Sequence, residues 1–166
     1  MAKDESFDVV SEVNLQEVDN AFQQAKKELA QRYDLKDSKA TLEFDKGAHR
    51  FTLAAPSDFV ARQVIDVLNS KLVARKVDLK AVHWSDPEAA SGMTVRLHGS
   101  LIEGLSKELS GKINKDIRDL KLKKVKVQIE GDKLRVFSPS RDELQEVITF
   151  LKGNDYGQPL QYINYR

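Results

Sequence analysis

The sequence repeats one pattern of apolar and polar residues twice, and this repeat constrains the fold more than any other feature. Residues 1–86 and 92–166 each contain, in the same order, a strand, a helix, a two-stranded hairpin, a second helix and a closing strand. A repeat of this length predicts two small domains rather than a solenoid. The βαββαβ order predicts an α+β fold, in which each half has two helices on one face of a four-stranded antiparallel sheet.

Boundary signals in the first half place its helices. Asn14 followed by Glu17 predicts a capped helix start, and apolar residues at spacings of three and four continue to near Arg32. The segment Pro56-Ser57-Asp58 predicts the start of the second helix. The expected strands are residues 6–13, a hairpin over 40–44 and 51–55, and a closing strand over 79–84.

The second half follows a short segment rich in turn formers. We expect residues 87–91 to be a linker between a domain of residues 1–86 and one of residues 92–166. Ser100 with Glu103 predicts the start of one helix, and Ser140 with Glu143 predicts the start of the other. The expected strands are residues 93–98, a hairpin that turns at 130–132, and residues 160–166.

Charge is unevenly distributed along the sequence. The 166 residues include 27 Lys and Arg and 26 Asp and Glu, but residues 1–90 have a balance of −3 and residues 91–166 one of +4. Between positions 112 and 126 only Asp116 and Asp119 oppose seven basic residues, which are Lys112, Lys115, Arg118, Lys121, Lys123, Lys124 and Lys126. Such a segment is either a patch that attracts phosphate or a solvated helix end with its loop.

The open face of the second sheet is expected to be basic. Residues that alternate with the inward apolar positions give a candidate nucleotide-binding surface of Arg96, His98, Lys124, Lys126, Lys133, Arg135 and Phe137. Cationic side chains attract phosphates, and an aromatic ring can stack on a base. Alternatively, the long cationic side chains only cover an exposed sheet and keep it soluble.

Several functional classes lack their signals. The chain has no cysteine, no run of roughly 18 apolar residues and no apolar core behind its first residues, so we expect a cytoplasmic protein without a membrane segment. Phosphate-loop, dinucleotide, zinc-protease and serine-hydrolase motifs are absent, so we expect neither catalysis nor a cofactor or metal. The alternating aromatics of the RNA-recognition motif are also absent.

Several segments resemble the YajQ family of small bacterial cytosolic proteins. They are residues 6–18 (SFDVVSEVNLQEV), Arg32-Tyr33-Asp34, residues 141–148 (RDELQEVI) and residues 159–166 (PLQYINYR). The resemblance implies two tandem ferredoxin-like domains, and it allows the first strand to be exchanged between the sheets. It further implies binding of a nucleotide, with ATP, GTP, transfer RNA and cyclic di-GMP as candidate ligands, and no enzymatic activity. Arg166 and Arg32 lie in these segments, and we add Arg166 to the candidate nucleotide-binding residues.

Two functions therefore stand at this point. The first is a binding module for a nucleotide, cyclic di-GMP or RNA that uses the basic surface of the second domain. The second is a protein-interaction or signalling adaptor, suggested by the charge difference between the halves, whose partner could be a transcription regulator. An enzyme is the least supported hypothesis, because no nucleophile, base and metal ligands occur together in a recognisable pattern.

Overall fold

The computed structural model describes residues 3–32, 35 and 37–166 as two compact units. Unit 1 comprises Met1–Glu12 and Glu103–Arg166, and unit 2 comprises Val13–Ile102. Tyr33 and Asp34, which carry part of the family resemblance, lie outside the described residues. No helix in the described ranges is long and apolar enough to cross a membrane.

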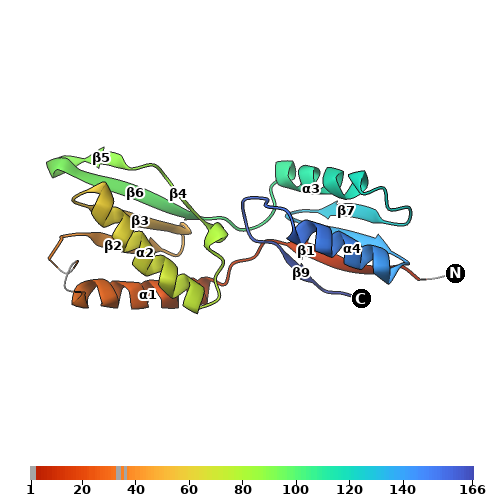
Figure 1. The fold of residues 1–166 in the computed structure, drawn as a ribbon, viewed down its shortest axis with the longest axis horizontal. Coiled ribbons are helices and arrows are strands. Elements are labelled where there is room, and N and C mark those ends of the chain that lie inside the picture. The colour runs from red at the N-terminus through yellow and green to blue at the C-terminus, as the bar shows by residue number, and fades with distance from the viewer. Residues whose placement is uncertain (1–2, 33–34, 36) are drawn as a thin grey trace. The chain divides into compact units, whose positions relative to one another are not determined.

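Unit 2 is a sheet covered on one face by two helices (Figure 1). The sheet order is β2 (Thr41–Asp45), β3 (Arg50–Ala55), β6 (Thr94–Leu101) and β4 (Val82–Trp84), and β5 (Glu88–Ala90) also pairs with β6. The helices are α1 (Leu15–Gln31) and α2 (Asp58–Ala74), and a short 3-10 turn, η1 (Leu79–Ala81), leads into β4. Phe51, Leu53, Leu68 and Leu72 are fully buried between the two layers.

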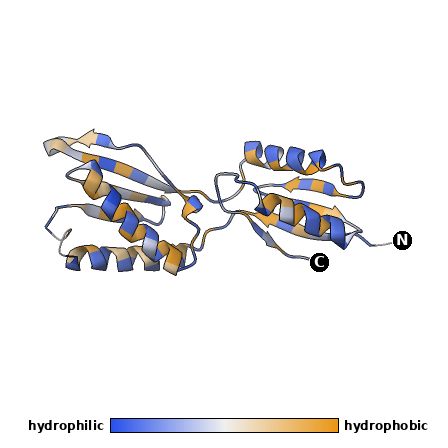
Figure 2. Ribbon diagram, viewed as in Figure 1, coloured by the Kyte–Doolittle hydropathy of each residue, from blue (hydrophilic) through white to orange (hydrophobic). Residues whose placement is uncertain are grey.

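Unit 1 has the same two-layer construction. Its sheet order is β7 (Lys126–Glu130), β8 (Lys133–Ser138), β1 (Glu5–Val10) and β9 (Gln161–Ile163), with helices α3 (Lys107–Asp119) and α4 (Arg141–Lys152). Apolar and polar residues alternate along the strands and helices, as Figure 2 shows. Phe7, Ile113, Leu134 and Leu144 are fully buried in its core. The two units confirm the predicted fold of two ferredoxin-like domains.

The first strands of the two domains are exchanged, as the family resemblance allowed. β1 precedes α1 in the sequence, but it lies between β8 and β9 in unit 1, where it contributes Phe7 and Val9 to the core. In unit 2 the corresponding place between β3 and β4 is occupied by β6. The units therefore differ from the expected domains of residues 1–86 and 92–166. The sequence could not predict this difference, because β1 and β6 have similar alternating patterns and nothing local specifies the sheet that each strand joins.

The expected linker is part of a sheet. Three of the residues 87–91 form β5 (Glu88–Ala90). In this strand Glu88 pairs with Arg96 of β6, and Ala90 pairs with Thr94. The turn that follows, η2 (Ser91–Met93), reverses the chain into β6. The prediction of a linker was wrong because a short strand of small residues, with only Ala90 partly buried, has little apolar pattern in the sequence.

Side-chain caps fix most of the helix starts that were expected. Asn14 accepts a hydrogen bond from the Glu17 backbone N–H at the start of α1, and Ser140 accepts one from the Glu143 N–H at the start of α4. The prediction for Ser100 was wrong, because Ser100 lies in β6, which continues to Leu101. The residue that caps α3 is Ser106, whose Oγ lies 3.1 Å from the Leu109 nitrogen.

Candidate functional site

The strand exchange divides the predicted nucleotide-binding residues between the two units. Arg96 and His98 lie on β6, in the sheet of unit 2, where they are opposite Ala54 and Thr52 of β3. The other predicted residues belong to unit 1, and they are Lys124, Lys126, Lys133, Arg135, Phe137 and Arg166. The single surface expected from the sequence therefore becomes two separate sets of side chains.

On the open face of unit 1, β1 places an acidic residue among the predicted cations. The side chain of Asp8 is only 1% exposed, and its Oδ1 lies 2.9 Å from Nε of Arg135. Its Oδ2 lies 3.6 Å from Nζ of Lys133 and accepts a 2.9 Å hydrogen bond from Asn164. The hydrogen bond from Arg135 lowers the pKa of Asp8 to about 2. Asp8 therefore stays ionised and neutralises much of this positive charge.

A second acidic group also engages Arg135. Nη1 of Arg135 lies 3.7 Å from a carboxylate oxygen of Glu130, and the two acidic partners raise the pKa of the guanidinium. Lys133 and Arg135 are thus internal ion-pair partners as well as surface cations. This arrangement could not be predicted from the sequence, because Asp8 was expected in the sheet of the first domain, together with β2 and β3.

The remaining predicted residues of unit 1 are Phe137 in the middle of the sheet, Arg166 after β9 and Lys124 before β7. Phe137 is half-buried and is opposite Ser6 of β1 and Lys126 of β7 in the strand register. Arg166 is exposed, and its backbone exchanges two hydrogen bonds with Ser6, at 2.9 and 3.0 Å. Lys124 is exposed in the segment between α3 and β7.

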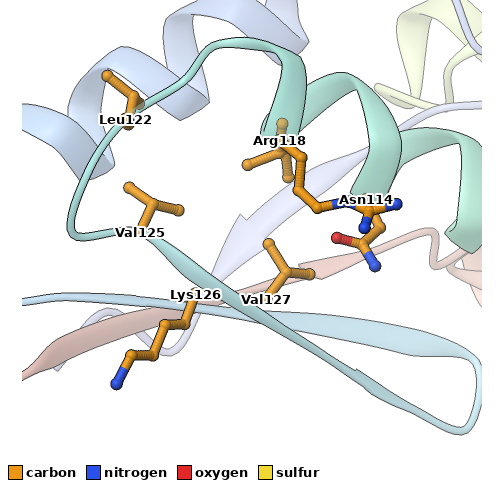
Figure 3. Close-up of a pocket in the computed structure, with 7 residues that line it drawn as sticks. Asn114, Arg118, Leu122, Val125, Lys126 and Val127 are labelled. Atoms are coloured by element: carbon orange, nitrogen blue, oxygen red, sulfur yellow. The ribbon is translucent and has the colours of Figure 1, made fainter.

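A cavity of about 430 Å³ opens between α3 and β7, which is an edge strand (Figure 3). Figure 3 shows Val125 and Val127 pointing toward α3, and Lys126 pointing to the opposite side of the strand. The apolar part of the lining is Ile117, Leu122, Val125 and Val127, and the polar part is Asn114, Arg118 and Lys126. Asn114 and Arg118 are four residues apart, so they share one face of α3.

The cations of this cavity are not neutralised. Within the described part of the chain, neither Arg118 nor Lys126 has a carboxylate within ion-pair distance. The loop between α3 and β7 adds three exposed lysines, Lys121, Lys123 and Lys124. The arrangement combines an apolar floor with fixed positive charge, as sites for amphipathic anionic ligands do.

One acidic residue of α3, Asp116, has a structural partner. Asp116 accepts a 2.9 Å hydrogen bond from the hydroxyl of Tyr156, and burial together with this bond raises the pKa of Tyr156. Nζ of Lys112 lies 5.5 Å from the centre of the Tyr156 ring. Asp116 thus joins α3 to the segment after α4, and Tyr156 packs against the core of the unit.

Sequence reasoning identified the charge of this region but not its cavity. Arg118 and Lys126 both belong to the basic segment of residues 112–126, yet only Lys126 was predicted as a site residue. Asn114 carried no signal except its spacing from Arg118. The cavity depends on how closely α3 packs against β7, and a one-dimensional pattern does not contain that information.

The open face of unit 2 is more mixed. Nδ1 of His98 lies 3.4 Å from Oγ1 of Thr52, and Arg96 is opposite Glu88 of β5 in the register. Across residues 3–32, 35 and 37–166, no three His, Cys, Asp or Glu side chains are grouped so that they could hold a metal ion. β6 holds Arg96 and His98 in the sheet of unit 2, and neither residue lines the cavity between α3 and β7.

Comparisons with known proteins agree over the whole chain. The family described as "nucleotide-binding protein YajQ-like" matches residues 5–166. A protein named nucleotide-binding protein from Desulfitobacterium hafniense is 48% identical over 166 residues, which is all of both chains. Proteins of the same name from Rhodococcus opacus and Chloroherpeton thalassium are 48% and 43% identical, with 97–99% of each chain covered. The chain therefore belongs to the YajQ-like family.

Proposed function

We propose that this chain is a non-enzymatic, cytoplasmic nucleotide-binding protein and that the cavity between α3 and β7 holds the nucleotide. The observation that carries the proposal is Arg118, without an acidic partner in the described structure, beside an apolar floor and an edge strand whose other side has Lys126, which also lacks an acidic partner in that part of the chain. The names of the relatives support the ligand class, since each is called a nucleotide-binding protein.

The chemistry of the lining suggests a role for each part. Arg118 would contact phosphate oxygens in the cavity, because charge-assisted hydrogen bonds to anions are the strongest available here. Lys126 points to the other side of β7, so it would contact a phosphate that extends past this edge strand. The aliphatic side chains would contact the base or sugar, and the amide of Asn114 can both donate and accept hydrogen bonds. Lys121, Lys123 and Lys124 would raise the local concentration of anions.

Most of the site residues that the sequence predicted have secondary roles in this proposal. Lys133 and Arg135 already bind Asp8, so a phosphate would compete with a buried carboxylate for them. Lys126 lines the proposed site and Lys124 lies in the loop before it, whereas Phe137 and Arg166 are not among the lining residues. Arg96 and His98 would act separately, on unit 2.

The first test is a fluorescence-anisotropy titration of labelled cyclic di-GMP at about 150 mM salt, a level at which surface charge is screened beyond roughly 8 Å. The double variant Arg118→Glu/Lys126→Glu should bind at least tenfold more weakly, because each charge-assisted hydrogen bond contributes about 1.5–3 kcal/mol. Lys27→Glu is the control, since Lys27 is exposed on α1 of unit 2. Unchanged affinity in the folded double variant would reject this site.

Competition with unlabelled RNA separates two forms of the proposal. If RNA fails to displace cyclic di-GMP, the cavity is a site for a small nucleotide. If RNA displaces it and the affinity for RNA falls steeply with salt, the cavity and the loop lysines form one surface for a phosphate backbone. If the chain binds neither cyclic di-GMP nor RNA, the proposal is wrong and the basic segment only keeps the surface soluble.

The charge difference that suggested an adaptor is absent when charges are counted by structural unit. By structural unit, unit 1 has 14 Lys and Arg and 14 Asp and Glu, and unit 2 has 13 and 12. The balances of −3 and +4 arise only when the sequence is divided at residue 90, and the strand exchange makes that division inappropriate. Recognition of a protein partner through opposite charges on the two units therefore has no support.

A further inference from the structure

Unit 2 has a cavity at the position that corresponds to the proposed site of unit 1. It lies between α1 and β2 and measures about 200 Å³, against about 430 Å³ for the cavity between α3 and β7. In the order of the repeat, α1 corresponds to α3 and β2 corresponds to β7. Both cavities therefore lie between the first helix of a unit and the first strand of its hairpin.

Seven lining residues of unit 2 correspond to the seven of unit 1, and the eighth, Glu43, has no counterpart. In each unit three helix residues share the spacing i, i+3, i+4, one leucine follows the helix, and three residues surround the start of the strand. In unit 2 these are Lys26, Leu29, Ala30, Leu35, Ala40, Thr41 and Leu42, and in unit 1 they are Asn114, Ile117, Arg118, Leu122, Val125, Lys126 and Val127. The apolar floor is thus present in both units.

The two linings differ in charge. Ala30 and Thr41 stand where unit 1 has Arg118 and Lys126. The cation that unit 2 does have, Lys26, forms a 3.2 Å ion pair with Glu43, which also lines the cavity. The described lining residues of unit 2 therefore have a net charge of zero, whereas those of unit 1 have a net charge of +2.

We infer that the cavity between α1 and β2 is a second site of the same kind, and that Glu43 prevents it from binding anions. The chain would therefore take up one nucleotide rather than two. Glu43 would repel a phosphate directly, and its ion pair with Lys26 leaves no uncompensated cation among the described lining residues to attract one. This inference rests on the proposed function, because the ligand class comes from the cavity of unit 1.

The test counts binding sites by isothermal titration calorimetry with GTP as the probe. The variant Ala30→Arg/Glu43→Gln gives the unit 2 cavity the charge of its counterpart, and we expect it to bind one more equivalent of GTP than the parent chain. Ala30→Arg/Glu28→Gln is the matched control. It has the same net charge and also releases a lysine, because Glu28 is paired at 2.8 Å with Lys71 of α2, but Glu28 does not line the cavity.

The outcomes separate this inference from the proposed function. A gain of one equivalent that is absent from the control supports the inference, and its persistence in an Arg118→Glu/Lys126→Glu background assigns it to unit 2. No gain in a variant with a native circular-dichroism spectrum, or an equal gain in the control, overturns it. The proposed function fails independently if the parent chain binds no GTP, cyclic di-GMP or RNA.

Discussion

At the scale of single residues, Asp8 links the fold to the electrostatics of the unit 1 surface. It is a carboxylate from the first strand of the sequence, buried beside Arg135 and Asn164 from its last third. An ionised group in such a position is retained only where hydrogen bonds and opposite charges replace water. Asp8 thus stabilises β1 between β8 and β9 as long as it stays ionised.

This position predicts a pH dependence of stability. The pKa of Asp8 is about 2 in the folded chain, lower than the ordinary 3.8, so protonation favours unfolding. The contribution is complete above about pH 4 and is lost as the pH falls from about 4 to about 2, and it amounts to at most about 2 kcal/mol. Urea unfolding between pH 7 and pH 2.5 measures the loss.

Asp8→Asn should lower the free energy of unfolding at pH 7 and flatten its decline in the acidic range. Asp4→Asn is the control, because Asp4 is exposed near the start of the same strand. If the free energy of unfolding of Asp8→Asn falls with pH in parallel with that of the parent chain, the Asp8 carboxylate is not a source of the acid sensitivity.

At the scale of elements, the start of α3 shows how sheet pairing outweighs a local capping signal. Ser100 and Glu103 have the spacing of a capping box, yet Leu101 pairs with Val82 and its N–H donates to the carbonyl of His49. The chain therefore completes β6 before the helix can begin, and Ser106 becomes the cap.

We predict that Ser106→Ala lowers the free energy of unfolding by about 1 kcal/mol, the usual cost of losing a serine N-cap. Ser100→Ala should change it by less than about 0.5 kcal/mol, the usual range for an exposed surface position. Denaturant unfolding of both variants checks the pair. A larger loss for Ser100→Ala than for Ser106→Ala would contradict the assignment of the cap.

The elements themselves were largely predictable because their signals are local. Asn14, Ser57 and Ser140 each cap the helix that the sequence predicted, and the turn around Gly131 joins the expected hairpin strands. The failures involve contacts between distant segments. The sequence does not specify that β1 pairs with β8, or that the packing of α3 against β7 leaves a cavity beside Asn114 and Arg118.

At the scale of the whole molecule, the exchange determines which parts of the chain can fold alone. Residues 13–102 contain every element of unit 2, so we expect this fragment to fold cooperatively. Residues 92–166 lack β1, which bridges β8 and β9, and residues 1–86 lack β6, which bridges β3 and β4. Neither of these fragments should show a cooperative transition in urea, monitored by circular dichroism.

A mixture of the fragments 1–86 and 92–166 provides the positive control. Between them they contain the strands and helices of both units apart from β5 and the first residue of η2, so mixing should restore a cooperative transition. A cooperative transition of residues 92–166 alone would show that unit 1 does not need β1.

The exchange also affects how the protein is made on the ribosome. Glu5 pairs with Ser138, so at about 5–20 residues per second β1 waits on the order of ten seconds for its neighbour to be synthesised. Unit 2 is complete in the nascent chain well before that time, because it ends at Ile102. During the interval Phe7, Val9 and Val10 have no sheet to enter, and an unpaired apolar strand readily joins other chains. We therefore expect the first dozen residues to be the segment that chaperones bind during translation.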